Sequence, residues 1–430
     1  MVFFSDGNEN EKLEGERISE LLDGMLGKLG NLNRILIIPP DITRYHSYAG
    51  EITRILYRKL KKTSYVEIMP ALGTHMPLTE DEMDLMYHGI PKEIFKKHDW
   101  KNDIIEIGTI RTEVVKELTG ALVDFPIRCE INKTLIEGNW DQIISIGQLM
   151  PHELIGIANH NKNIFVGVGG KDIIDKSHFI GALYGAEEIM GHVDSPVRRV
   201  LDYMAANFTK HLPISYILTV RGFDENKQLV TRGIYAGNDK DCYLQGAELC
   251  KKVNIKLVEK EYKKVVAYLD PGEYKSTWTG NKALQRTRMM IADGGELLIL
   301  APGISVFSED SENDAIMRKY GYRNKASLLK AVRGNDDLAN NLAAASALIV
   351  GSTENRFRVT YAVKKMTREE VESVNYDYAD YEETVKKYDP FVLKAGINLL
   401  PDGEEVFFVP QPALGLWAEY NRYSKNDKRD

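Results

Sequence analysis

Short apolar runs that alternate with helical patterns constrain the fold of this chain more than any other feature. Three of these runs are strand-sized: residues 35–38, 65–70 and 141–148. A loop and then an amphipathic helical pattern follow the first two runs, at residues 49–61 and 80–88. Because strand, loop and helix recur in this order, the sequence predicts a mostly parallel sheet covered by helices on both faces.

The second half of the chain repeats this rhythm after a more β-like stretch at residues 207–224. We expect helices at residues 247–262 and 277–293, and strands at residues 264–269 and 296–301. The remaining features are two apolar segments and a polar tail that we expect to be frayed: residues 327–332, residues 338–351 and the chain after Tyr420. The predicted fold class is α/β with two domains, an N-terminal Rossmann-like domain over residues 1–265 and a smaller C-terminal α/β domain over residues 266–430.

The composition excludes several classes of protein. With 430 residues, 43% of them hydrophobic, the chain is long enough to bury large cores, which argues against intrinsic disorder. The 56 basic and 63 acidic side chains give a net charge of -7, so we expect no nucleic-acid partner and no membrane partner. The N-terminus lacks the basic start and long apolar run of a secretory signal, and the three cysteines lack metal-ligand spacing. We therefore expect a cytoplasmic protein.

Polar side chains follow each of the first three predicted strands. Asp41, Thr43 and Arg44 follow the first strand, His75 follows the second and His152 follows the third. The carboxyl ends of parallel strands meet at one edge of the sheet, which is where open α/β sheets bind ligands. There Arg44 can bind a phosphate or carboxylate, and two histidines that titrate near neutral pH can exchange protons with a ligand. A helix entry, a surface ion pair or a tight turn is the alternative interpretation at each position.

Two lysines also lie in patterns that are typical of ligand binding. Gly169-Gly170-Lys171 combines glycines that allow close backbone approach with an amine that can neutralise a phosphate or react covalently. The chain has neither the Walker A spacing nor a GxGxxG fingerprint there, and a solvent-exposed turn is the alternative. Lys282 begins a predicted helix after Trp278 and Thr279 and can bind a carboxylate, although capping and packing are the simpler interpretation.

Taken in order, six motifs resemble those of the nickel-pincer lactate racemase family over roughly residues 34–300. They are Asp41-Ile42-Thr43-Arg44, Gly73-Thr74-His75, His98-Asp99, Pro151-His152, Gly169-Gly170-Lys171 and Ser195-Pro196-Val197-Arg198. Members of that family carry a nickel-pincer nucleotide, a pyridinium-3-thioamide-5-thiocarboxylic acid mononucleotide tethered to a lysine. It binds nickel through sulfur, carbon and sulfur, and a histidine supplies the fourth ligand. The resemblance implies two α/β domains with the active site in the cleft between them.

The resemblance also implies a role for most of the residues singled out above. Lys171 resembles the tethering lysine, His75 and His152 the acid/base pair, and Arg44 the residue that orients the substrate. The other implied contacts are with the nucleotide for Asp41, Thr43, Gly169 and Gly170, and with the substrate for Trp278, Thr279 and Lys282. His178 is preferred over His192 as the nickel ligand, and His98 receives no role.

The implied reaction is inversion at C2 of a 2-hydroxy acid by proton-coupled hydride transfer. One histidine takes the hydroxyl proton, the α-hydrogen moves to the cofactor as hydride, and its return to the other face inverts the centre. A histidine near neutrality could hardly remove the very weakly acidic α-hydrogen as a proton, so an electrophilic cofactor is needed. The implied partners are the hydroxy acid and the enzymes that synthesise the cofactor and insert nickel.

Two departures from the family pattern affect these expectations. Residues 159–163 make the segment before Lys171 longer than usual, which weakens the fit around that lysine. Trp278-Thr279 replaces the Tyr-Gln pair of lactate racemases, and Thr279, Gly280 and Asn281 would present polar groups to a longer substrate. We therefore expect a polar or sugar acid, such as an aldonate, in preference to lactate.

Two other classes of function remain open from the sequence. The chain could be a non-catalytic nucleotide or sugar-acid binding protein, or an NAD-linked sugar-acid oxidoreductase. The absence of GxGxxG counts against the oxidoreductase.

Overall fold

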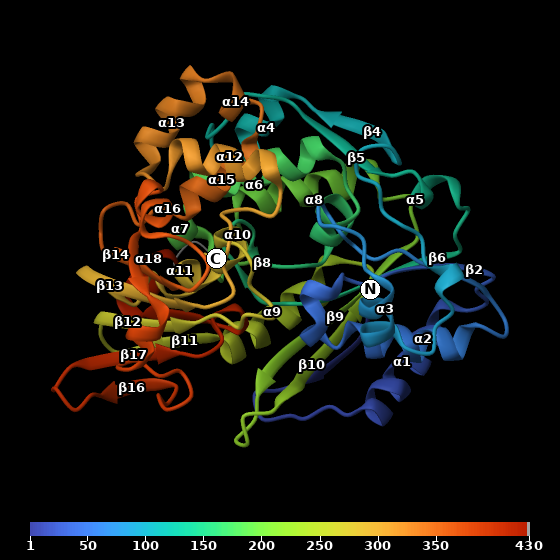
Figure 1. Ribbon diagram of the computed structural model, residues 1–430. Coiled ribbons are helices and arrows are strands. Elements are labelled where there is room, and N and C mark those ends of the chain that lie inside the picture. The colour runs from blue at the N-terminus through green and yellow to red at the C-terminus, as the bar shows by residue number, and fades with distance from the viewer. Residues whose placement is uncertain (428–430) are drawn as a thin grey trace. The chain divides into compact units, whose positions relative to one another are not determined.

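The computed structural model describes residues 1–427, which form two compact units (Figure 1). Unit 1 comprises residues 1–177 and 193–254, and unit 2 comprises residues 178–192 and the chain from Ile255 onward. The expected boundary between residues 265 and 266 falls inside a strand of the unit 2 sheet. A break there would separate residues that are hydrogen-bonded to both neighbouring strands.

Unit 1 contains most of the motifs found in the sequence. Its strands are β1 (Val2–Gly7), β2 (Arg34–Ile38), β3 (Tyr65–Ile68), β4 (Ile104–Ile110), β5 (Ile127–Asn132), β6 (Gln142–Gln148), β7 (Pro151–His152), β8 (Gly156–Ile157), β9 (Ile214–Phe223) and β10 (Leu229–Gly237). Its helices are α1 (Gly15–Leu29), η1 (Ile42–Ser47), α2 (Ala49–Leu60), α3 (Glu80–Tyr87), η2 (Lys92–Ile94), α4 (Thr112–Thr119), α5 (Thr134–Glu137), the π-helical η3 (Asn163–Gly167), α8 (Pro196–Phe208) and α9 (Lys240–Asn254). Helix α6 (Lys171–Tyr184) begins in unit 1 and ends in unit 2.

The main sheet of unit 1 has the strand order β1-β10-β9-β6-β2-β3. Strands β3, β2, β6 and β9 pair in parallel, and β10 and β1 continue the sheet in antiparallel orientation. The chain first builds outward from β2 to β3 and then returns to add β6 on the other side of β2. This mostly parallel, doubly wound sheet confirms the predicted α/β fold class.

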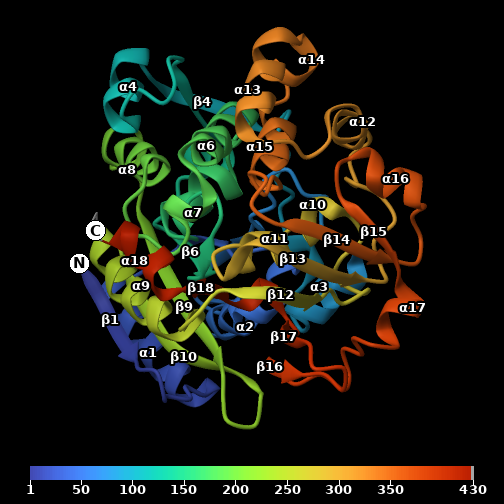
Figure 2. The ribbon, with the colours of Figure 1, turned by 90° about the vertical axis from the view of Figure 1, so that its left-hand side faces the viewer.

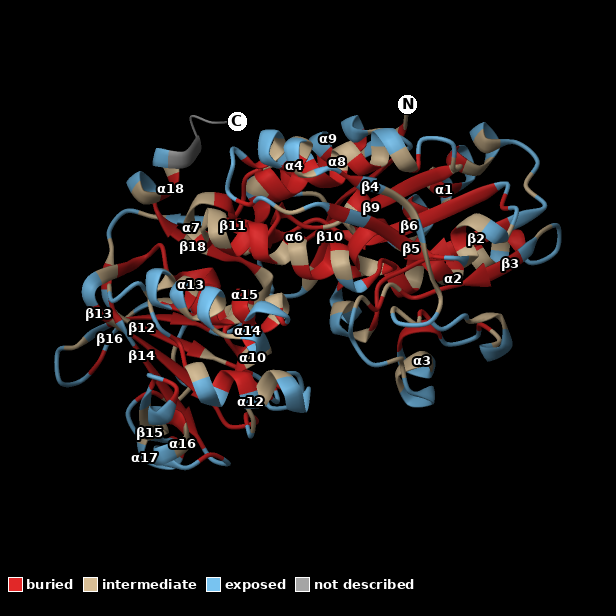
Figure 3. Ribbon diagram, turned by 90° about the horizontal axis from the view of Figure 1, so that it is seen from above, coloured by how far each residue is buried: buried red, intermediate tan, exposed pale blue. Residues whose placement is uncertain are grey.

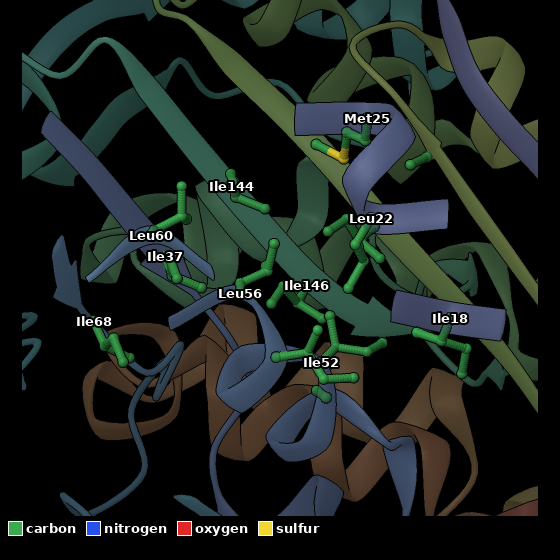
Figure 4. Packing of buried hydrophobic residues seen from close by; sticks show 14 of the residues in the cluster. Ile18, Leu22, Met25, Ile37, Ile52, Leu56, Leu60, Ile68, Ile144 and Ile146 are labelled. Atoms are coloured by element: carbon green, nitrogen blue, oxygen red, sulfur yellow. The ribbon is translucent and has the colours of Figure 1, made fainter. Parts of the chain in front are cut away.

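Helices cover both faces of this sheet, as the alternating pattern predicts. On one face, α1 and α2 bury an aliphatic stripe against the strands (Figure 4), whose fully buried members include Ile18, Leu22, Met25, Ile37, Ile52, Leu56, Ile144 and Ile146. The burial of each such side chain stabilises the folded protein by roughly 1.5–3 kcal/mol. Helix α9 lies on the opposite face, because Gly233 of β10 lies against Leu249 whereas the adjacent Ile234 belongs to the α1–α2 core.

Unit 2 is a second α/β structure. Its strands are β11 (Ile255–Val258), β12 (Tyr262–Tyr268), β13 (Ile291–Ala301), β14 (Arg358–Val363), β15 (Asp377–Asp380), β16 (Gly396–Leu399), β17 (Glu405–Val409) and β18 (Leu416–Glu419). Its helices are α7 (Ala186–Ile189), α10 (Thr277–Gly280), α11 (Lys282–Thr287), α12 (Ser311–Tyr320), α13 (Lys325–Gly334), α14 (Asp336–Ala339), α15 (Leu342–Val350), α16 (Arg368–Ser373), α17 (Tyr381–Val385), η4 (Pro412–Leu414) and α18 (Tyr420–Asp427).

The unit 2 sheet has the order β15-β14-β13-β12-β17-β16, and every pair is parallel except β16 with β17 (Figure 2). Its core includes Val266, Leu298, Leu300, Val406 and Phe408. In both sheets the strands are mostly buried and the covering helices expose their outer faces (Figure 3). No described helix is long and apolar enough to cross a membrane.

Three sequence predictions of local structure are wrong. The helix expected at residues 247–262 is α9, which ends at Asn254, whose side chain donates to the Arg221 carbonyl at 2.8 Å. The helix expected over residues 277–293 ends at Thr287, and the chain enters β13 at Ile291.

The third wrong prediction is the frayed tail after Tyr420. Residues 420–427 form α18, because Arg422 pairs with Glu261 at 2.7 Å and Tyr423 is buried. The last residues of the predicted tail, 428–430, lie outside the described residues.

Candidate active site

The topology of unit 1 places the switch point of the sheet between the carboxyl ends of β2 and β6, where the strand order reverses. Asn163, at the start of η3, spans the two strand ends. Its side-chain amide donates to the Ile38 carbonyl at 3.2 Å and to Ser145 Oγ at 2.9 Å. The segment around Asn163 therefore lies directly over the position where such sheets bind ligands.

The loop after β2 carries Asp41, Thr43 and Arg44. Asp41 caps η1, since its Oδ1 accepts from the Thr43 N–H at 3.1 Å and from the Thr43 hydroxyl at 2.5 Å. Arg44 is half-buried and departs from helical geometry within η1, with φ -116° and ψ 29°. The charge of Arg44 also acts on Asp41, so the structure brings these three predicted residues together.

The loop after β3 runs beside the loop after β2 and delivers His75 to Asp41. The Ala71 N–H donates to the Pro39 carbonyl at 2.7 Å, and Gly73, in the left-handed region with φ +57°, donates to the Gly167 carbonyl at 2.8 Å. His75 Nδ1 then lies 2.6 Å from Asp41 Oδ2. Since the carboxylate can only accept, His75 donates from Nδ1, and Nε2 is the ring's proton-accepting atom.

The contact with His75 keeps the buried carboxyl group of Asp41 ionised. Asp41 is only 4% exposed, and burial alone would raise the pKa of its carboxyl group. The hydrogen bond and charge of His75, followed by Thr43 and Arg44, outweigh that effect and hold the Asp41 pKa below its ordinary value. Asp41 is therefore an anion that fixes the tautomer and orientation of the imidazole.

The third loop presents His152 in the opposite tautomer. His152 lies in β7, which pairs with β8, and its side chain is buried. His152 Nδ1 accepts from the Leu154 N–H at 3.2 Å, so the neutral ring carries its proton on Nε2. The adjacent Glu153 places Oε2 3.9 Å from His152 Nδ1.

Sequence reasoning missed Lys162, which precedes Asn163 at the switch point. The pKa of Lys162 is lowered to about 8, because burial disfavours the ammonium form and Arg44 and Arg198 repel it. Asp41 and Glu153 act in the opposite direction. Lys162 thus shares one electrostatic environment with the first and third loops. The position of Lys162 after the third predicted strand is the sequence feature that could have identified it. The sequence analysis instead treated residues 159–163 only as extra length before Lys171.

The Ser195-Pro196-Val197-Arg198 motif is connected to this site through the buried side chain of Arg198. Ser195 caps α8 by accepting from the Arg198 N–H at 3.0 Å, and Arg198 is fully buried. Its guanidinium donates to the Ile157 carbonyl at 2.7 Å, to Asn161 Oδ1 at 2.5 Å and to the Asn159 carbonyl at 3.2 Å. Arg198 therefore holds the loop that leads into Lys162.

Lys171 belongs to a different group of residues. It begins α6, is exposed, and pairs with Asp175 one turn along the helix. A Cβ on Gly169 would meet the Phe165 carbonyl oxygen at 1.8 Å, and one on Gly170 would meet Glu130 Oε2 at 2.4 Å. The close approach that these glycines allow is thus to the protein's own backbone and side chains.

His98 supports the same turn. It is 2% exposed, its Nε2 lies 3.2 Å from the Gly169 carbonyl oxygen, and Asn132 Nδ2 donates to its Nδ1 at 3.1 Å. Burial lowers the His98 pKa to about 4 despite the Gly169 hydrogen bond, so the ring is neutral at pH 7. The structure gives His98 a structural role.

The two histidines considered as nickel ligands both lie in unit 2. His178 is half-buried on α6, whereas His192 is 3% exposed and stacks on Tyr423 with ring centroids 5.1 Å apart. Within the described chain, no three His, Cys, Asp or Glu side chains form a cluster that could hold a metal. The three cysteines are all buried.

The residues predicted for substrate binding in unit 2 follow β12. Trp278 and Thr279 are half-buried in α10, and the Thr279 hydroxyl donates to the Ser276 carbonyl at 3.2 Å. Lys282 Nζ lies 5.8 Å from the centroid of the Tyr274 ring. The substrate contacts of Trp278, Thr279 and Lys282 stay predictions.

Asn281 was expected to offer polar groups to a substrate and instead belongs to a buried tyrosine cluster. It is 2% exposed, and its Oδ1 accepts from the Tyr361 hydroxyl at 2.7 Å and the Tyr376 hydroxyl at 3.1 Å. Gly280 packs against Ile304, where a Cβ would approach Cδ1 to 2.6 Å. Neither residue supports the expectation of a polar substrate lining.

The fold is that of a doubly wound α/β protein, and the candidate site lies at its topological switch point, at the edge formed by β2, β3 and β6. Comparison with known proteins bears on the family. Residues 8–191 match the model of the lactate racemase N-terminal domain. This match supports the resemblance to the lactate racemase family that the motifs predict. The family suggests an isomerase of the racemase or epimerase type.

Solved structures show that the fold is shared along the chain. A Thermotoga maritima protein of known crystal structure is 22% identical, with a TM-score of 0.81 over 95% of this chain and 99% of that protein. The lactate racemase apoprotein from Thermoanaerobacterium thermosaccharolyticum is 18% identical, with a TM-score of 0.70 over 96% of this chain and 95% of that protein. No curated protein matches the chain.

Proposed function

We propose that this protein inverts C2 of a 2-hydroxy acid, using His75 and His152 as the acid/base pair and a nickel-pincer nucleotide as cofactor. The observation that carries the proposal is the contact of His75 with the buried Asp41, beside Arg44 and Lys162 at the switch point. The imidazole of His75, oriented by an anion, can move a proton. The guanidinium of Arg44 can bind a carboxylate, and the Lys162 amine, with its lowered pKa, can attach a cofactor.

The two histidines hold their protons on different ring atoms, and this difference suits inversion. His75 donates from Nδ1 to Asp41, so Nε2 can accept the hydroxyl proton of the substrate. His152 accepts at Nδ1 from Leu154, so its neutral ring presents Nε2–H as a hydrogen-bond donor to the substrate oxygen. To give that oxygen a proton, His152 acts from the imidazolium form. The forward reaction then leaves His75 as imidazolium and His152 as neutral imidazole, so the two rings exchange roles in the reverse direction.

We propose Lys162, in place of Lys171, as the residue that attaches the nucleotide. With a pKa near 8, roughly a tenth of Lys162 is unprotonated and nucleophilic at pH 7. Thr43 is the proposed contact of the nucleotide in the first loop, while Lys171 is ion-paired with Asp175. His178 is the proposed nickel ligand, and one histidine suffices where the nucleotide supplies the other donors. When bound, the group supplies the hydride acceptor that the reaction needs.

The proposed substrate class is a 2-hydroxy acid whose carboxylate pairs with Arg44. A preference for a hydroxylated acid such as an aldonate over lactate rests on Trp278 and Thr279 alone, because Asn281 is committed to the tyrosine cluster.

The test is NMR of C2 configuration in deuterium oxide. Protein co-expressed with the cofactor-synthesis and nickel-insertion enzymes is supplied with a panel of C3 to C6 2-hydroxy acids. We expect inversion with little deuterium at C2, since the same hydrogen returns. Extensive deuteration would contradict the hydride route, and fastest turnover of lactate would contradict the substrate preference. Binding without inversion would favour a binding protein, and a change in absorbance that requires NAD would favour an oxidoreductase.

A further inference from the structure

Each of the two proposed acid/base histidines has a carboxylate beside its Nδ1 atom. Asp41 Oδ2 lies 2.6 Å from Nδ1 of His75, and Glu153 Oε2 lies 3.9 Å from Nδ1 of His152. The first distance is that of a hydrogen bond, and the second is about 1 Å longer than one. The function proposed above uses Asp41 and assigns no role to Glu153.

Glu153 lies in the turn that joins β7 to β8, and hydrogen bonds from two other elements hold this hairpin. The Ser195 hydroxyl donates to the Ile155 carbonyl at 3.1 Å, and the Tyr243 hydroxyl donates to the Ile157 carbonyl at 3.2 Å. The backbone of the turn is therefore fixed, whereas the Glu153 side chain can rotate about its own torsions. Such a rotation is enough to close a gap of about 1 Å.

Burial makes a charged His152 ring costly unless an anion lies beside it. The side chains of His152 and Glu153 are 8% and 13% exposed, whereas the His75 side chain is 56% exposed. Desolvation disfavours an imidazolium ion, and an opposite charge within about 4–6 Å favours it. The buried histidine therefore needs a neighbouring carboxylate more than the exposed one does.

Two cations lie near the same turn. Lys162 is in the field of Glu153, and Arg198 donates to the Ile157 carbonyl of β8 at 2.7 Å. β8 itself has no ionisable side chain, and Tyr243 of α9, whose pKa is raised to about 12 by burial, is neutral at pH 7. Glu153 is thus an anion beside His152 in surroundings that otherwise disfavour the imidazolium form.

Proton transfer at Nε2 in both directions requires a proton on Nδ1 of His152. In the neutral ring Nδ1 accepts from the Leu154 N–H, so the single ring proton is on Nε2. A proton taken from solvent at Nδ1 gives the imidazolium, which then loses its Nε2 proton to the substrate oxygen. The ring that remains has its proton on Nδ1 and a lone pair on Nε2, which takes the hydroxyl proton in the reverse direction. The Leu154 N–H is a donor, so it cannot hold the Nδ1 proton in either form.

We propose that Glu153 is the positioning residue of His152 and accepts its Nδ1–H in both of these forms. The carboxylate of Glu153 then does for His152 what that of Asp41 does for His75. The partner of Nδ1 changes from the Leu154 N–H in the resting neutral ring to Glu153 Oε2 in the imidazolium. This inference rests on the proposed role of His152, and it assigns Glu153 no contact with substrate or cofactor.

NMR titration of the histidine rings in the apoprotein tests the pairing, with the His152 signals assigned from their loss in His152→Ala. Glu153→Gln keeps the shape of the side chain and removes its charge. We therefore expect the proton affinity of His152 to fall at least tenfold, or about one pH unit in the midpoint. The matched control Glu113→Gln removes an exposed carboxylate from α4 and leaves the midpoint unchanged.

Two results of the titration would overturn the proposal. One is an equal His152 midpoint in the wild type and Glu153→Gln. The other needs no variant: a wild-type His152 ring that stays neutral at about pH 5 has no anion that stabilises its charged form.

Kinetics of the cofactor-loaded enzyme separate positioning from substrate binding. With turnover counted per bound cofactor, Glu153→Gln should lower kcat at least tenfold in both directions and leave KM within about twofold, because the carboxylate acts on the ring. A raised KM with an unchanged kcat would contradict the positioning role. If the loaded wild type inverts no 2-hydroxy acid, the proposed function fails, and the titration still decides whether Glu153 pairs with His152.

Discussion

The lowered pKa of Lys162 predicts that this amine reacts at a pH where other lysines do not. At pH 7 an amine of pKa about 8 is roughly a tenth unprotonated, against about 0.03% for an ordinary lysine of pKa 10.5. The reactive fraction is thus about 300-fold larger. A less basic nucleophile is also intrinsically weaker, and a Brønsted slope of about 0.45, as for thiols, removes about one order of magnitude. The net expected advantage is about 20-fold.

The assay is brief acetylation of the apoprotein with acetic anhydride at pH 6 to 11, followed by peptide mass spectrometry. The acetylation rate of Lys162 should rise with a midpoint near pH 8, well below the midpoint of an ordinary lysine. Partial burial of Lys162 scales its rate but does not move its midpoint. The midpoint is therefore the decisive quantity.

Two substitutions test the cause of the shift with opposite signs. Arg44→Gln removes a repelling cation, so the pKa of Lys162 and the midpoint should rise. Glu153→Gln removes an attracting anion, so both should fall. The reasoning is refuted if the rate for wild-type Lys162 climbs tenfold per pH unit beyond pH 9, or if both variants move the midpoint in the same direction.

Three further predictions concern the groups around Lys162. His75→Ala and His152→Ala should each lower turnover by about 10² or more while the cofactor stays bound. The control His211→Ala, at an exposed position, should keep wild-type turnover. A wild-type rate in either of the first two variants would remove the substituted histidine from the mechanism. The folded-state pKa of Asp41 lies below its ordinary value, so its stabilising effect is present above about pH 4 and is lost as the pH falls through the folded pKa. Asp41→Asn should accordingly flatten the acid limb of stability in urea titrations from pH 3 to 6, and an unchanged slope would contradict the ion pair. Arg198→Gln removes several buried charged hydrogen bonds and should lower the free energy of unfolding by about 2–4 kcal/mol in urea; a change below about 0.5 kcal/mol would show that the loop does not depend on it.

The sequence alone was sufficient to predict the framework of the site. The apolar runs that became β2, β3 and β6 are long enough to be strands, and the loops that follow them carry Asp41, His75 and His152. Parallel strands bring their carboxyl ends to one edge whatever the details of packing. Local periodicity did not predict helix α18, because this helix depends on tertiary contacts. Arg422 pairs with Glu261, and Tyr423 is buried.

Only the tertiary structure points to Lys162 as the candidate lysine of the site. From the sequence, Lys171 after two glycines was the better candidate, and Lys162 between two asparagines carried no recognisable motif. In the fold, the glycines pack against Phe165 and Glu130, while Lys162 lies in the field of Arg44 and the other charges around the switch point. The charge state of an amine depends on its desolvation and on nearby charges, and two of the charges that act on Lys162, those of Arg44 and Asp41, come from a loop far away in the sequence. No local pattern in the sequence contains that information.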